Sequence, residues 1–139
     1  MTQLTKIYQD YLAKAEKVRK KASPLAGIFG LGDDPRKHPC HEEFYEAVEE
    51  WVSGYTPSDP EEVLEVVKYI LQAPAAHENN RDVYWFLYAA QALTMPLIPK
   101  LNPADRQALA AWYDQTYPKR VRFPAQNQVL KCLKTGKQP

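Results

Sequence analysis

The chain has 139 residues, of which 25% are charged and 45% hydrophobic, and its formal net charge at pH 7 is +1, a composition that excludes wholesale disorder. Its two cysteines are too few for a disulfide scaffold, and no apolar run is long enough to cross a bilayer. Because the N-terminus also has no apolar signal segment, these features predict one soluble, cytoplasmic helical domain over residues 1–139.

Apolar residues that recur at three- and four-residue spacing predict five to six helices and no sheet, so the fold class is all-α. Such helices pack either as an irregular bundle or as stacked helical hairpins. The expected helices cover residues 3–22, 39–53, 60–73, 81–94, 103–116 and 124–135.

The first helix carries one apolar stripe, with Thr2 as its expected N-cap. Ser23 precedes a proline, which disfavours the α conformation and is expected to end the helix there. The connection over residues 24–38 is too apolar to stand free in water, so we expect it to lie against the core.

The third helix has a capping-box pattern, in which Asp59 is the N-cap, Pro60 the first helical residue and Glu62 the N3 residue. Pro74 is expected to end it. The pair Asn102-Pro103 repeats the Asp59-Pro60 pattern 43 residues later, which is within the spacing of HEAT or armadillo repeats.

Residues 81–94 are apolar on nearly every side, which predicts a helix buried at the centre of the fold. The same segment is rich in aromatic residues. Tyr84, Trp85 and Tyr88 cannot all face one core, and such side chains are enriched at protein interfaces. They are therefore candidate binding residues, and the alternative is a core that simply uses many aromatics.

The segment His38-Pro-Cys40-His41 is the best chemical candidate, because imidazole and thiolate are preferred zinc ligands. Cys40 at a helix N-terminus is expected to have a lowered pKa. The further ligands would be His77, Cys132 or acids such as Asp33 and Asp34. The alternative is a helix entry with half-exposed histidines and a cysteine that fills space in the core.

The net charge is unevenly distributed along the chain. Residues 1–22 carry six basic and two acidic side chains. Residues 33–114 carry six basic and 15 acidic ones, and residues 115–139 carry six basic and no acidic ones. Lys119, Arg120 and Arg122 lie among aromatic residues in this last segment, a combination that can hold phosphates and stack bases. Alternatively, the basic end docks on the acidic middle of the same chain.

No motif in the chain identifies a reaction, and no cofactor is expected other than the zinc considered above. We therefore expect a non-catalytic helical module that binds another protein or assembles with itself. The alternatives are a nucleic-acid-binding accessory protein that uses the basic C-terminal segment, and a zinc-binding protein that uses His38, Cys40 and His41.

Overall fold

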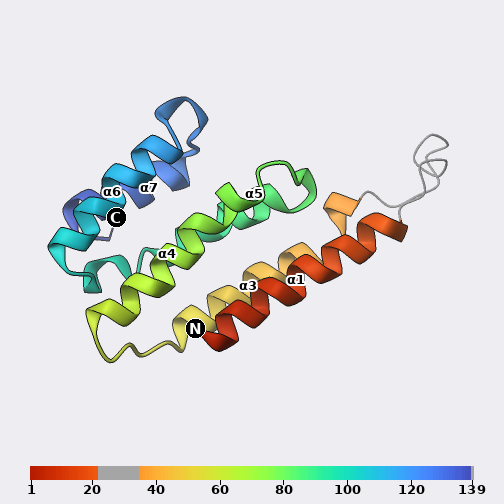
Figure 1. The fold of residues 1–139 in the computed structure, drawn as a ribbon, viewed down its shortest axis with the longest axis horizontal. Coiled ribbons are helices and arrows are strands. Elements are labelled where there is room, and N and C mark those ends of the chain that lie inside the picture. The colour runs from red at the N-terminus through yellow and green to blue at the C-terminus, as the bar shows by residue number, and fades with distance from the viewer. Residues whose placement is uncertain (22–34, 139) are drawn as a thin grey trace.

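The structure, a computed structural model, describes residues 1–21 and 35–138. Within these ranges the chain forms helices and no strand, which confirms the all-α prediction (Figure 1). The α-helices are α1 (Thr2–Lys21), α3 (Cys40–Ser53), α4 (Pro60–Ala76), α5 (Arg81–Ala90), α6 (Pro103–Thr116) and α7 (Pro124–Thr135). The short 3₁₀ helices are η1 (Pro35–Lys37), η2 (Gln91–Thr94), η3 (Ile98–Lys100) and η4 (Lys119–Val121). The apolar connection over residues 24–38 is predicted to lie against the core. Its residues up to 34 lie outside the described ranges.

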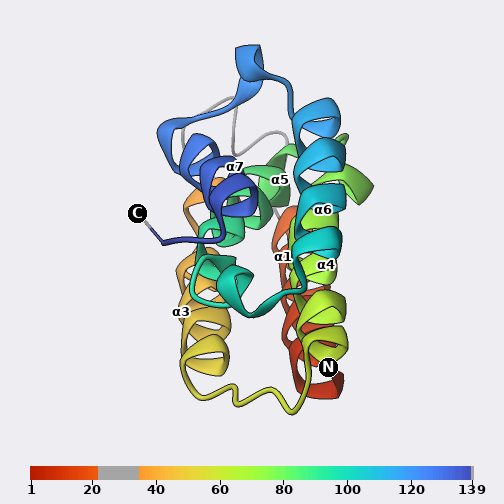
Figure 2. The same cartoon turned by 90° about the vertical axis from the view of Figure 1, so that its left-hand side faces the viewer.

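The helices are arranged as three stacked hairpins. The most extensive contacts are those of α1 with α3, α4 with α5, and α6 with α7. Between hairpins, α4 contacts α6, α3 contacts α5, and α7 packs along η2, the continuation of α5. In Figure 2, α4 and α6 lie on one side of the molecule and α3 and α7 on the other. The described helices therefore pack as hairpins against one another in a helical bundle.

Most of the expected helix starts are confirmed, with differences in how they are capped. The Asp59 carboxylate accepts a hydrogen bond from the Glu62 N–H at 2.8 Å, and the Glu62 carboxylate accepts one from the Ser58 N–H at 3.0 Å. Asn102 occupies the corresponding position before α6, but its side chain makes no capping hydrogen bond. Thr2 is already helical, and the Met1 carbonyl accepts the first helical bond.

The prediction that Pro74 ends the third helix is wrong, because α4 continues to Ala76. A proline in the last turn removes only the hydrogen bond to the carbonyl four residues earlier, and the later residues keep theirs. The ring of Pro74 is buried, so its packing against the core offsets part of that loss.

A buried polar network joins the second hairpin to the third. The Leu71 carbonyl accepts hydrogen bonds from Gln91 Nε2 at 2.9 Å and from the Tyr117 hydroxyl at 2.8 Å. The Tyr113 hydroxyl donates to Gln91 Oε1 at 2.9 Å. Since these side chains come from η2 and from the end of α6, the network sets how α6 lies against α4 and η2.

Helix α5 is central, as expected, but it is not buried on every side. It contacts α1, α3 and α4, and its Val83 and Leu87 are fully buried. Trp85 is 49% exposed on the remaining face. None of the helices in the described part of the chain has the length and hydropathy needed to cross a membrane.

Candidate functional site

An apolar groove lies over the open face of α5. One hollow of about 550 Å³ has Ala89 and Ala92 at its floor, Tyr45 of α3 on one side and Phe123 at the start of α7 on the other. A second hollow of about 440 Å³ also includes Ala92 and continues over η2 beside Glu49 of α3. We call the two adjoining hollows the α5 groove. Its walls are α3 and α7, and its floor is α5 with η2.

The aromatic end of this groove is formed by two large, exposed side chains. Trp85 is 49% and Phe123 52% exposed, and their rings stack with centroids 5.4 Å apart and planes 19° apart. Tyr88 lies beneath both and meets each ring edge to face. Trp85 and Tyr88 are among the binding residues predicted from the sequence, whereas Phe123 enters that prediction only as one of the aromatic residues in the basic segment.

Tyr84 joins this cluster from the preceding turn of α5. Its ring stacks on that of Tyr88 and meets Trp85 edge to face, with centroids 5.8 Å and 5.0 Å away. The three aromatic residues expected on this helix are therefore one contiguous group, with Tyr88 buried, Tyr84 half-buried and Trp85 exposed.

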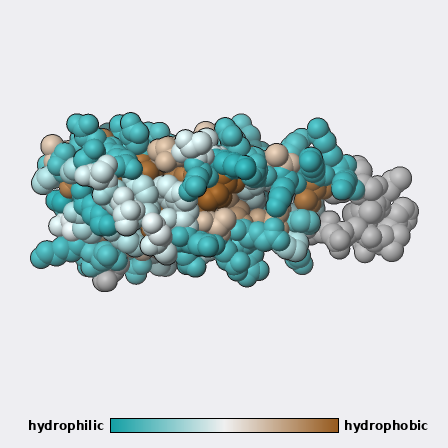
Figure 3. Space-filling model, turned by 90° about the horizontal axis from the view of Figure 1, so that it is seen from below, coloured by the Kyte–Doolittle hydropathy of each residue, from teal (hydrophilic) through white to brown (hydrophobic). Residues whose placement is uncertain are grey.

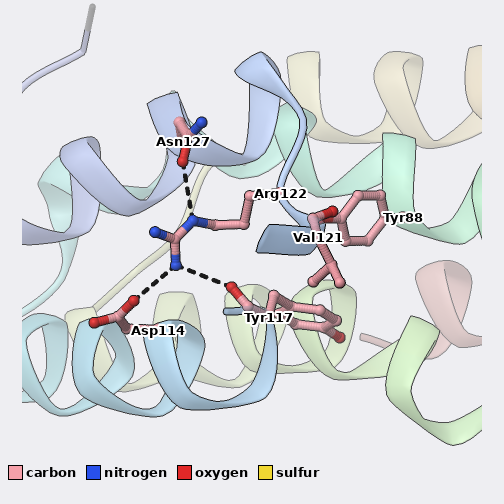
Figure 4. A network of polar contacts seen from close by, with 6 residues as sticks. All are labelled: Tyr88, Asp114, Tyr117, Val121, Arg122 and Asn127. Carbon is pink, nitrogen blue, oxygen red and sulfur yellow. Dashed lines mark hydrogen bonds and ion pairs between the residues drawn. The ribbon is translucent and has the colours of Figure 1, made fainter. Parts of the chain in front are cut away.

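The segment that carries Phe123 is held in place by Arg122, as Figure 4 shows. The Arg122 guanidinium donates to Asp114 Oδ1 at 2.7 Å, to the Tyr117 carbonyl at 2.9 Å and to Asn127 Oδ1 at 2.9 Å. Its side chain is only 7% exposed. The hydrogen bond from Arg122 to Asp114, together with the positive charge of the guanidinium, holds the pKa of Asp114 below its usual value.

The structure brings the two groups of predicted binding residues together, because the Tyr88 hydroxyl donates to the Val121 carbonyl at 3.2 Å. Arg122 is one of the predicted cations. It makes the three hydrogen bonds described above, and its partner Asp114 belongs to the acidic middle of the chain. Lys119 and Arg120 are exposed on η4, and neither forms an ion pair with another described residue. They therefore stand free beside the aromatic end of the groove.

The predicted zinc ligands have other partners. His41 is buried, with Nε2 donating to the Pro35 carbonyl at 2.8 Å and Nδ1 accepting from the Tyr11 hydroxyl at 2.6 Å. This assignment follows because a carbonyl can only accept a hydrogen bond. His38 is exposed, and its Nδ1 accepts a hydrogen bond from the Cys40 N–H at 3.1 Å.

The expected low pKa of Cys40 is wrong. Burial raises the pKa of this thiol, and the neighbouring carboxylate of Glu43 raises it further. Loss of water around the thiolate thus outweighs the helix N-terminus. In the described ranges, no three His, Cys, Asp or Glu side chains are placed to share a metal ion. Asp33 and Asp34 lie outside those ranges, so both alternatives for this segment, a zinc site and an ordinary helix entry, stay predictions.

A wider hollow of about 860 Å³ lies at the other end of the molecule, between the start of α1 and the end of α3. Its lining mixes Trp51 and Tyr55 with charged residues such as Lys6, Asp10 and Glu50. The face that carries α1 is largely hydrophilic, with hydrophobic residues gathered in separate patches (Figure 3). The α5 groove is more apolar and has the more exposed aromatic side chains, so it is the better candidate.

Comparison of the chain with protein-family models, with curated proteins and with solved structures found no match. Function is therefore inferred from the residues of the α5 groove alone.

Proposed function

We propose that this chain is a non-catalytic module that binds another protein in the α5 groove. The observation that supports this most is the exposed, stacked pair of Trp85 and Phe123 at the end of the groove. An aromatic pair that is half in water gains free energy when a partner covers it, at about 25 cal/mol per Å² of apolar surface. Trp and Tyr are also the residues most enriched among those that dominate binding energy.

The groove is preorganised for binding. Tyr88 is buried under the rings of Trp85 and Phe123. Arg122 holds the segment before α7 in place through three hydrogen bonds. Side chains that are already ordered lose little conformational entropy when a partner arrives. Stacked helical hairpins in general also present a continuous surface along one layer, which repeat proteins use to bind partners.

A nucleic acid is the second candidate, because bases stack on exposed aromatic rings near cations such as Lys119 and Arg120. The wall formed by α3 argues against it. Glu42, Glu46 and Glu49 are all exposed on this helix, which has no Lys or Arg, so phosphates along that wall would meet negative charge. We therefore favour a protein partner.

The test is a selection of displayed peptides on the folded protein. Selected peptides are expected to lose at least about 30-fold in affinity when Trp85 or Phe123 is changed to alanine, as is typical of residues that dominate an interface. Gln107→Ala, an exposed change on α6, is the matched control and should leave affinity unchanged. Circular dichroism checks that each variant is folded.

The proposal is refuted if every selected peptide binds Trp85→Ala and Phe123→Ala as tightly as the unchanged protein. Sedimentation at several protein concentrations distinguishes a foreign partner from self-association. A dimer that dissociates on Phe123→Ala would mean that the groove is occupied by a second copy of the chain.

A further inference from the structure

We propose that the occupant of the α5 groove is an amphipathic α-helix of the partner, with basic side chains toward α3 and acidic or polar ones toward α7. This inference rests on protein binding in that groove and adds the conformation and charge pattern of the partner segment. It follows from what the floor and the two walls of the groove offer.

The floor favours a helix over an extended peptide. It is itself a helical segment, α5 with η2, and its backbone hydrogen bonds are made within the segment, so it has no free sheet edge to pair with. An extended peptide would place unpaired N–H and C=O groups in an apolar hollow, whereas a helix satisfies its own. Ala89 and Ala92 at the floor allow the backbone of such a helix to come close.

The two hollows are neighbours along the floor of the groove. They adjoin at Ala92, one under the aromatic pair and one over Met95 and Pro96 of the next turn. Apolar residues three or four positions apart project from one face of a helix and would fill adjacent hollows.

The wall formed by α3 is acidic. Glu49 lines the second hollow, and Glu42 precedes Tyr45 by three residues, so both carboxylates share the ridge of Tyr45 along the groove. Burial raises the pKa of Tyr45, and the nearby Glu49 carboxylate raises it further. A partner helix would therefore place Arg or Lys beside α3.

The wall formed by α7 is uncharged where it lines the groove, and its positive charge lies beside the groove. From Pro124 to the end of the chain the charged residues are Lys131, Lys134 and Lys137, with no acid. Lys131 and Lys137 line a hollow of about 340 Å³ along α7, and Gln138 lines both that hollow and the second hollow of the groove. Opposite charges on the two sides of the groove set the orientation of a helix that lies between them, because only one orientation pairs both of its flanks.

The test uses two synthetic peptides of about 18 residues, or about 27 Å of helix, stapled to hold the helical form. One has an apolar stripe flanked by Arg on one side and Glu on the other, and its isomer has the flanks exchanged. Binding of the fluorescein-labelled peptides is measured by anisotropy. The matching peptide is expected to bind about tenfold tighter, the effect of two exposed charge pairs that change from attraction to repulsion.

A charge-reversed protein makes the test sharper. In the double variant Glu49→Lys/Lys131→Glu, the preference between the two peptides should invert. The matched control, Glu65→Lys/Lys68→Glu, makes the same exchange on the exposed face of α4 and should keep the original preference. High salt should reduce the difference in both proteins.

The outcomes separate this inference from the proposed function. Equal binding of the two peptides to both proteins overturns the charge assignment. If neither peptide binds while displayed peptides still depend on Trp85, the partner is not such a helix, although the groove binds protein. If no peptide of any kind depends on Trp85, the proposed function and this inference both fail.

Discussion

Changing Gln91 to methionine tests whether the buried network holds the second and third hairpins together. Gln91 is fully buried, donates to the Leu71 carbonyl at 2.9 Å and accepts from the Tyr113 hydroxyl at 2.9 Å. Methionine has a similar length but offers neither an N–H donor nor a carbonyl acceptor. The Leu71 carbonyl keeps its bond from Tyr117, but the Tyr113 hydroxyl loses the partner to which it donates.

The expected loss follows from these contacts. Two neutral hydrogen bonds contribute about 1 kcal/mol each, and an orphaned buried hydroxyl adds about 1 kcal/mol or more. The free energy of unfolding should therefore fall by about 2–4 kcal/mol, a large part of the roughly 5–15 kcal/mol that holds a domain folded. Urea unfolding followed by far-ultraviolet circular dichroism measures it, with Gln107→Ala on the exposed face of α6 as a control expected within about 0.5 kcal/mol.

A double-mutant cycle gives the more specific result. Tyr113→Phe removes the hydroxyl that Gln91→Met leaves without a partner, so the double variant should be more stable than the two separate losses predict. The expected coupling is about 1–2 kcal/mol. A loss below about 0.5 kcal/mol for Gln91→Met, or strict additivity in the cycle, would refute this account of the network.

Four further outcomes are expected. Gly136 ends α7 with φ +72°, and an added methyl group would overlap the Arg106 guanidinium. Gly136→Ala should therefore lower the unfolding free energy by at least about 1 kcal/mol. An unchanged thermal midpoint would contradict this. Burial raises the pKa of all nine tyrosines above their ordinary value near 10. Above pH 10 the folded state then holds more protons than the unfolded state, so stability should fall as the pH rises past 10. Absorbance at about 295 nm should show whether tyrosinate forms together with unfolding. The double change Lys119→Ala/Arg120→Ala should alter stability by less than about 0.5 kcal/mol, and an oligonucleotide of mixed sequence should stay unbound to the unchanged protein even at low salt. Elemental analysis of untagged protein should find no stoichiometric zinc, whereas about one zinc that disappears on Cys40→Ser would establish the site.

The sequence by itself determined the helices of this protein and most of their ends. The apolar spacing of α1 and α3 predicts which of their faces are buried, because residues three and four apart lie on one side of a helix. The carboxylate of Asp59 caps α4, and Gly136 closes α7 in the left-handed conformation. These signals act within a few residues along the chain, so they can be read without knowledge of the fold.

Only the tertiary structure decided which side chains face the groove. Trp85 is exposed because α3 and α7 stand on either side of α5 without covering it, and Phe123 joins it from 38 residues away. The same long-range packing ties Arg122 to Asp114 and encloses His41 between Tyr11 and the Pro35 carbonyl. The burial of a side chain and its hydrogen-bond partners depend on residues far apart in sequence. The helical periodicity of one segment does not show which other helices that segment will contact.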